Sequence, residues 1–330
     1  MDNLCDQANT SSCLVSVLSP SENSDPTNEL QSTVKPCPIQ TRNMDVSKIK
    51  NTTSNGKSTP ASNGKLTPVS TVHGSQCSNI TQSISDILTF YHSQELKVDI
   101  HSNYMLEQPE LKPKYRETLI DWLFEIQIAF GFQLESLYLS ILIIDRYLGL
   151  RIVKKKYLQL VGIAALRLAC KYEEQLKLNS TDFCRMAANV YTTRQLTKAE
   201  GAILKALEYR LSFPTAHHFL TCFLQNYSWS KGLVGVAHYI CESSLLQYRL
   251  LKFHPSKIAA SAIYIARNTH GIAPWTCSLS KLTTYESADL QVCLKELRNC
   301  FGEPHPQKNV VDLKFESSTF GHASLKELKF

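Results

Sequence analysis

Few side chains in this sequence have the type and spacing that chemistry requires. Adjacent His217 and His218 could hold a metal, but the other histidines are spread singly, so we expect helix capping or surface exposure. Glu173 and Glu174 could act as a general acid and base, yet Arg167 and Lys171 on the same expected helix favour a solvated ionic cluster. Cys170 lies in an apolar helical stretch, which favours a small core residue over a nucleophile. These patterns predict no enzyme, no metal site and no cofactor.

Charge and cysteine patterns exclude further classes. The basic cluster of Arg151, Lys154, Lys155 and Lys156 could attract phosphate or acidic partners, although we favour a solvated junction between a loop and a helix. The net charge of +6 is spread over the expected helices, so we expect no nucleic-acid partner. No apolar run approaches the roughly 18 residues of a membrane span, and we expect no membrane association. The 11 cysteines include no CxxC pair, which indicates free thiols.

The aromatic residues divide the chain. All 14 Tyr, 13 Phe and 3 Trp residues lie at or after Phe90. Because a core needs large apolar side chains, we expect a disordered leader over residues 1–83. Within it SNGKSTP recurs as SNGKLTP, and three hydroxyl residues directly precede a proline: Ser19, Thr59 and Thr67. Such dipeptides occur in any polar tail; the alternative is phosphorylation, which would add up to about two negative charges at each site.

From residue 84 onward the apolar periodicity is helical, which predicts an all-α fold. The clearest face is formed by Leu119, Leu123, Ile126 and Phe130. We expect one set of helices at 114–130, 134–148, 154–174, 180–188 and 194–209. A second set is expected at 214–227, 231–246, 255–268, 279–284 and 288–301.

The two sets are similar to each other. The third helix of each is rich in small residues, which lets neighbouring helices approach closely and suits the centre of a bundle. A constant offset of 97 residues relates Ala165, Leu168 and Ala169 to Ala262, Ile265 and Ala266. This indicates an internal duplication, with units at 84–211 and 212–302 and a more polar tail at 303–330 that we expect to pack only in part.

The first long helix carries a second stripe, formed by Tyr115, Leu119 and Trp122. A lone Trp is commonly a core residue, but a helix with two apolar stripes can pack with one and offer the other to a partner. Arg116 lies in an apolar context and needs a counterion if it is buried. Asp145 in the next helix is the obvious candidate.

Several segments give the sequence a resemblance to a known family. They are YMLEQPELKPKYRETLIDWLFEI (104–126), IDRYL (144–148), LQLVGIAALRLACKYEE (158–174), VYTTRQL (190–196), FHPSKIAASA (253–262) and SSTFGHASL (317–325). Together they resemble the cyclins, in the mitotic A/B group and most like the A-type. The resemblance implies two tandem five-helix cyclin boxes preceded by a short N-terminal helix. It also implies a non-catalytic activating subunit of a cyclin-dependent Ser/Thr kinase, acting as a heterodimer in S/G2/M, in the nucleus with some cytoplasmic presence.

The resemblance also implies a kinase-binding site. Lys171 and Glu200 match the charged pair by which cyclins hold the regulatory helix of the kinase. Apolar contact area would come from Tyr172, Leu204, Tyr209, Leu211, Ile87 and Phe90. In the second unit Asn268 stands where the first has Lys171, so only one unit would bind the kinase this way.

A second implied site recruits substrates and inhibitors that carry an Arg-x-Leu motif. It comprises Tyr115, Leu119, Trp122, Glu125 and Gln159, and Arg116 with Asp145 would be a structural ion pair beside it. The family usually has Met at the position of Tyr115. Neither an Arg-x-x-Leu destruction box nor a Lys-Glu-Asn motif is present in residues 1–83.

Two other interpretations stay open at the level of sequence. One is a cyclin-box scaffold that does not activate a kinase. The other is a transcription-type factor that bridges nucleic acid, for which a zinc ribbon would be expected and is not seen.

Overall fold

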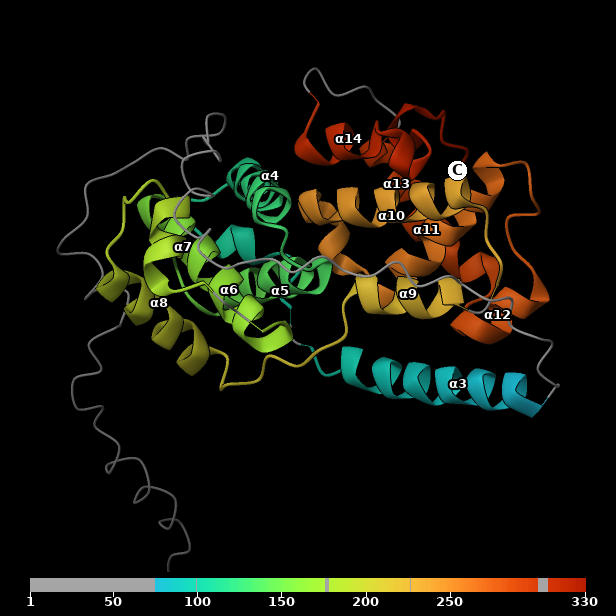
Figure 1. The fold of residues 1–330 in the computed structure, drawn as a ribbon, viewed down its shortest axis with the longest axis horizontal. Coiled ribbons are helices and arrows are strands. Elements are labelled where there is room, and N and C mark those ends of the chain that lie inside the picture. The colour runs from blue at the N-terminus through green and yellow to red at the C-terminus, as the bar shows by residue number, and fades with distance from the viewer. Residues whose placement is uncertain (1–74, 99, 176–177, 226, 302–307) are drawn as a thin grey trace, which may run out of the picture. The chain divides into compact units, whose positions relative to one another are not determined.

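The computed structural model describes residues 75–330 except 99, 176–177, 226 and 302–307. All regular secondary structure in this part of the chain is helical, which confirms the expected all-α class (Figure 1). Most of the expected leader, 1–83, lies outside the described residues. So do the three proposed phosphorylation sites, Ser19, Thr59 and Thr67.

The N-terminal helix is longer than the sequence suggested. Helix α3 covers Ser75–Glu95, a total of 21 residues, and begins inside the expected leader. Buried Ile84 and Leu88 lie one turn apart and pack this helix onto the second helical unit. Once these turns are fixed, each preceding residue adds a hydrogen bond at little further entropic cost, so polar Ser and Asn residues can extend the helix.

The first helical unit contains α4 (Pro113–Phe130), α5 (Leu134–Leu150), α6 (Leu158–Glu173), α7 (Ser180–Met186) and α8 (Thr193–Ala206). Pro113 occupies the first helical position of α4, and Gly131 ends that helix in the left-handed conformation with φ of 70°. Asn179 and Thr192 form capping boxes at the starts of α7 and α8. Helix α6 lies in the centre, in contact with α4, α5 and α8.

The second helical unit contains α9 (Ala216–Gln225), α10 (Lys231–Leu246), α11 (Pro255–Thr269), α12 (Cys277–Thr283) and α13 (Ser287–Phe301). Its third helix, α11, again lies in the centre and contacts α9, α10 and α13. All six residues that indicated the duplication are buried: Ala165, Leu168, Ala169, Ala262, Ile265 and Ala266. In both units, small residues on the third helix therefore let the surrounding helices pack closely against it.

Short 3-10 helices fill three connections. They are η1 (Tyr104–Glu107), η2 (Lys155–Tyr157) and η3 (Tyr248–Lys252). The last of these joins α10 to α11. The hydroxyl of Tyr248 in η3 accepts a hydrogen bond from the N–H of Met105 at 3.0 Å. This contact links η1 of the first unit to η3 of the second.

The C-terminal segment packs more fully than the sequence suggested. It forms α14 (Val310–Phe315), η4 (Ser318–Phe320) and η5 (Ala323–Leu325) over α4 and α10 (Figure 1). Val311 and Phe315 are fully buried, and the N–H of Val310 donates to Asp121 Oδ1 of α4 at 2.8 Å. At Gly235 of α10 an added Cβ would lie 2.2 Å from the carbonyl oxygen of Phe320, so only glycine permits this approach.

The ion pair expected between Arg116 and Asp145 is present and fully buried. The guanidinium donates from Nε to Oδ1 at 2.6 Å and from Nη2 to Oδ2 at 2.7 Å. Its Nη1 donates to the carbonyl oxygen of Leu245 in α10 at 2.8 Å, and Tyr104 donates its hydroxyl to Asp145 at 2.8 Å. Burial, followed by the charge of Asp145, raises the pKa of Tyr104 and keeps its hydroxyl a donor. The pair therefore joins the two helical units.

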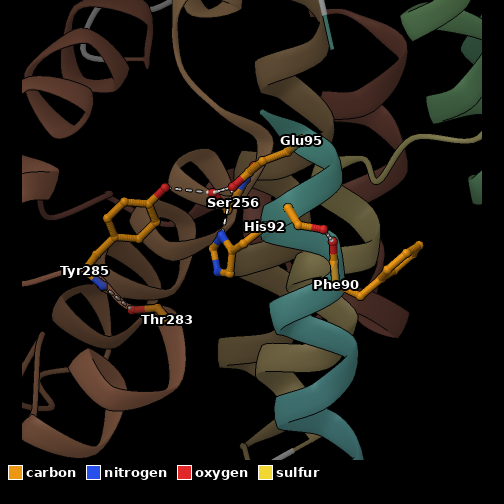
Figure 2. A network of polar contacts seen from close by, with 7 residues as sticks. Phe90, His92, Glu95, Ser256, Thr283 and Tyr285 are labelled. Atoms are coloured by element: carbon orange, nitrogen blue, oxygen red, sulfur yellow. Dashed lines mark hydrogen bonds and ion pairs between the residues drawn. The ribbon is translucent and has the colours of Figure 1, made fainter. Parts of the chain in front are cut away.

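A second polar network fixes α3 against the second unit. Figure 2 shows the carboxylate of Glu95 between His92 and Ser256, with the Tyr285 hydroxyl reaching Ser256 from the other side at 2.7 Å. Ser256, in the first turn of α11, donates to Glu95 from its hydroxyl at 2.7 Å and from its N–H at 3.1 Å. His92 Nδ1 lies 2.8 Å from the same carboxylate. A buried carboxylate at a helix N-terminus is stabilised by the free N–H groups there, so Glu95 pins α3 in place.

We expect Arg116→Met to lower the free energy of unfolding by about 3–5 kcal/mol, because it leaves the Asp145 carboxylate buried without a counterion. Chemical denaturation monitored by circular dichroism measures the change. The control is Lys114→Met, which breaks the exposed ion pair with Glu117 and should cost less than about 1 kcal/mol. Equal losses for the two variants would contradict a structural role for the buried pair.

We expect Glu95→Gln to loosen α3 without unfolding the rest, because the amide removes the charge that Ser256 and the start of α11 stabilise. Amide hydrogen exchange across residues 84–95 should become faster, while exchange in α6 stays unchanged. Ser93→Ala is the matched control, since the Ser93 hydroxyl is exposed and bonds only within its own helix. Unchanged protection of α3 in the Glu95 variant would rule out the pin.

Candidate functional site

The two charged residues expected at the kinase-binding site meet across α6 and α8. Lys171 Nζ lies 3.0 Å from both carboxylate oxygens of Glu200, although 29 positions separate them in the sequence. The Glu200 carboxylate is buried, whereas 41% of the Lys171 side chain is exposed. The structure thus presents an ammonium group at the surface, held by a carboxylate below it.

Arg167 is a third member of this charged group that the sequence analysis did not assign to it. Its Nη1 donates to Glu200 Oε2 at 2.6 Å. The sequence interpretation placed Arg167 with Glu173 and Glu174 in a solvated cluster, and this is wrong for Arg167. Its spacing of four residues before Lys171 was the available signal, because that spacing puts both side chains on one face of the helix.

Glu174 also has another role than membership of a solvated cluster. Glu174 accepts from the Ser136 hydroxyl at 2.6 Å and from the N–H of Gln133 at 3.3 Å, so it caps the start of α5. Burial and the neighbouring Glu135 raise the pKa of Glu173. Cys170 is fully buried, and burial raises the pKa of its thiol. The expectation of a core cysteine is confirmed.

Exposed apolar side chains accompany the Lys171 ammonium. Tyr172 follows it directly and is half exposed, and Tyr209 after α8 is 67% exposed. On α3, Phe90 is 58% exposed and Ile87 is also exposed. Phe90 lies on the opposite side of α3 from Glu95 in Figure 2. Large aromatic side chains in such positions are typical of protein interfaces.

Two contacts fix elements of this surface. The ring centre of Tyr91 on α3 lies 5.5 Å from that of His218 and 5.7 Å from that of Phe219, so α3 packs against α9. Arg146 donates from Nη1 to the carbonyl oxygen of Arg210 at 2.5 Å and lies over the Phe213 ring at 4.6 Å. It thereby fixes the segment that follows α8, a role that the sequence analysis did not foresee.

Two of the expected apolar contributors differ from the rest. Leu204 is only partly exposed. Leu211 is buried, so the expectation that it offers contact area is wrong. It lies in the connection between the two helical units, where its apolar side chain is shielded from solvent.

The stripe expected to dock Arg-x-Leu motifs is mostly buried. Leu119 and Trp122 are fully buried, and Gln159 is buried and accepts from the Tyr191 hydroxyl at 3.5 Å. The expectation of an exposed stripe is therefore wrong for these residues. Leu119 fills the space above Gly162 of α6, where an added Cβ would lie 2.7 Å from its Cδ1. Helix α14, which the sequence did not predict, adds a further neighbour to α4.

Only the rim of that stripe reaches the surface. Tyr115 and Glu125 are partly exposed. Lys155 Nζ lies 4.0 Å from the centre of the Tyr115 ring, a cation–π contact. The ammonium of Lys155, by hydrogen bonding first and charge second, lowers the pKa of Tyr115. The exposed end of the stripe is thus aromatic and cationic.

The adjacent histidines have different surroundings. His218 Nδ1 accepts from the N–H of Thr215 at 3.3 Å, which confirms helix capping at the start of α9. His217 is buried with its Nε2 3.3 Å from Glu135, so surface exposure is wrong for it, and burial lowers its pKa. Over the described ranges, no group of residues has the arrangement of a metal site.

The remaining exclusions concern thiols and membranes. The cysteines from Cys170 onward are free thiols: Cys170, Cys184, Cys222, Cys241, Cys277, Cys293 and Cys300. Within that same part, none of the helices has the length and apolar character needed to cross a bilayer.

Two family models match the chain in tandem. The cyclin N-terminal domain matches residues 86–212 and the cyclin C-terminal domain matches residues 214–328. Cyclin-A3-3 of Arabidopsis thaliana is 38% identical over 64% of this chain and 68% of its own length. Cyclin-B1-2 of the same plant is 39% identical, covering 65% and 48%. Cyclin-A1 of Mus musculus is 33% identical, covering 77% and 61%.

The alignments thus span about half to two thirds of these relatives. Among solved structures, a viral cyclin from herpesvirus saimiri has a TM-score of 0.58 at 22% identity, covering 66% of this chain and 97% of that chain. A chain of the yeast RNA Pol II CTD kinase CTDK-1 complex has a TM-score of 0.50 at 13% identity, covering 66% and 79%. At these identities both similarities concern the fold alone. The tandem domain matches and the similarity to A- and B-type relatives show that this chain belongs to the cyclin family, in its mitotic A/B group, whose members are non-catalytic regulatory subunits of kinases.

Proposed function

We propose that this chain activates a cyclin-dependent Ser/Thr kinase as one subunit of a heterodimer. The observation that carries the proposal is the half-exposed ammonium of Lys171, together with the exposed side chains of Tyr172, Tyr209 and Phe90. A partner that covers them would desolvate a charged donor beside apolar area, which is the composition of an interface centre. Family membership supports a kinase as that partner.

The chemistry of the proposed contact follows from the donors. An ammonium has three N–H groups and no acceptor, so Lys171 would bind carbonyl or carboxylate oxygens of the kinase. Docking would stabilise the inward position of the kinase helix whose Glu pairs the ATP-binding Lys. The activation is therefore a shift between two kinase conformations, caused by a partner that binds one of them better.

We propose that this activity controls progression through S/G2/M and takes place in the nucleus, with some cytoplasmic presence. Similarity to A- and B-type cyclins supports the phase. Neither a scaffold that binds no kinase nor a transcription-type factor that bridges nucleic acid would use the exposed Lys171 and aromatic side chains. No observation in the described residues favours either alternative.

We also propose that Arg-x-Leu substrates and inhibitors dock at the rim formed by Tyr115 and Glu125. Because Leu119 and Trp122 are buried, the motif can reach them only if the Tyr115 ring and the Lys155 side chain move aside. The Glu125 carboxylate would then receive the basic residue of the motif. In this chain the docking site is closed until a substrate displaces its cover.

The kinase proposal is tested with Lys171→Ala. We expect the affinity for a cyclin-dependent kinase to fall at least about tenfold, because a charged hydrogen bond at a desolvated interface is lost. Titration of the purified kinase and measurement of histone H1 phosphorylation give the two readouts. Lys281→Ala, an exposed lysine on α12, is the control and should change neither. Absence of kinase binding by the unsubstituted protein would refute the proposal.

The docking proposal is tested with two variants of opposite effect. Glu125→Gln should weaken phosphorylation of Arg-x-Leu substrates about tenfold, since it removes a charge-assisted bond. Tyr115→Met removes the cation–π cover and should strengthen it. A short peptide substrate without the motif is the control, and its phosphorylation should not change. If both variants behave like the unsubstituted protein on Arg-x-Leu substrates, docking takes place elsewhere.

A further inference from the structure

One carboxylate at the proposed kinase surface is shared by two cations. Glu200 binds Arg167 Nη1 at 2.6 Å and Lys171 Nζ at 3.0 Å, so this group of three side chains carries one excess positive charge. Neutralising a single buried carboxylate requires only one cation. Glu200 therefore has one cation more than neutralisation of its charge requires.

The two cations differ in burial. Only 12% of the Arg167 side chain is exposed, against 41% of Lys171. Arg167 also has an unused N–H donor, since its buried Nε has no hydrogen-bond partner among the described residues. Arg167 is thus the inner cation and Lys171 the outer one.

We propose that Arg167 is the permanent counterion of Glu200 and that it makes Lys171 a releasable cation. This inference rests on the proposed function in one respect, namely that a partner takes up the Lys171 ammonium. Were Lys171 the sole counterion, its transfer to a partner would leave the Glu200 carboxylate buried and unpaired, which is strongly unfavourable. With Arg167 in place, the carboxylate stays neutralised while Lys171 exchanges one set of oxygens for another.

The chemistry of arginine suits the inner position. Its guanidinium stays charged when buried and carries five N–H donors, so unused donors can take over the carboxylate oxygen that Lys171 leaves. Lysine suits the outer position, because its flexible stem can carry the ammonium toward a new acceptor. The helical spacing of four residues places the two side by side over α8.

The first experiment uses the free protein and needs no kinase. Thermal unfolding is measured for Arg167→Met, Lys171→Met and the double variant. We expect a fall in Tm of several degrees for Arg167→Met, a smaller fall for Lys171→Met, and for the double variant a fall larger than the sum of the two. Adding Glu200→Gln to the double variant should recover most of the loss, because no unpaired carboxylate remains.

A result in which Lys171→Met costs more than Arg167→Met, or in which the two effects merely add, would overturn the proposal. Arg167→Lys covers the case in which the Met variant does not fold, since it keeps the inner charge and should stay close to the unsubstituted Tm. If the lysine variant is as unstable as the methionine variant, charge at this position is not what Glu200 needs.

The second experiment titrates a cyclin-dependent kinase against the same chain. Arg167→Met should weaken binding by roughly tenfold, because Lys171 can no longer leave Glu200 at low cost. Arg167→Lys keeps the inner charge beside Glu200 and should bind the kinase with nearly the affinity of the unsubstituted chain. Equally weak binding by Arg167→Lys and Arg167→Met would sink the release mechanism. If the unsubstituted chain binds no kinase, the proposed function fails, and the unfolding cycle still decides the role of Arg167.

Discussion

The buried pair of Arg116 and Asp145 is the contact on which the arrangement of the two helical units depends. It gathers α4, α5, η1 and α10 around one guanidinium, since Tyr104 donates to the carboxylate and the carbonyl oxygen of Leu245 accepts from Nη1. A fully buried charge tolerates little displacement of its partners, because any lost hydrogen bond leaves it undercompensated. The pair therefore sets where the second unit lies against the first, and with it the place of everything that packs on either one.

The proposed kinase surface depends on that placement because its parts are held in place by both units. Lys171, Glu200 and Tyr209 belong to α6, α8 and the segment after α8, whereas Phe90 stands on α3, which Glu95 holds to Ser256 of α11. Hydrophobic packing alone would allow α3 to slide along the second unit. A directional, charge-assisted contact at its end fixes the register of the exposed side chains instead.

Much of the fold was predictable from sequence, for identifiable reasons. Helix α10 was predicted at its observed bounds, and α4 to within one residue because Pro113 and Gly131 mark its ends. Leu119 and Trp122 were misplaced because a helical wheel shows which residues share a face, but not how many neighbours cover the helix. The extra neighbour, α14, is a six-residue helix in a polar segment, too short to give a periodic signal.

The site was predictable through family resemblance in its Lys171 and Glu200 pair, but not in its Arg167. The resemblance assigned kinase-binding roles to Lys171 and Glu200 and none to Arg167, although Arg167 lies in the matched segment 158–174. Its spacing from Lys171 was visible. Its partner was not visible, because Glu200 lies 33 positions away in the sequence and only the tertiary packing of α6 against α8 brings the two together.

The covering of α4 by the C-terminal segment has a consequence for how the chain acquires its structure during synthesis. Val311 and Phe315 bury themselves against elements made much earlier, and Gly235 leaves room for Phe320 to close over α10. A ribosome releases residues in order, so the first helical unit keeps an uncovered apolar face until residues 310–325 emerge. In the nascent protein, α4 is therefore accessible to chaperones and prone to aggregation, although the C-terminal segment covers it in the folded protein.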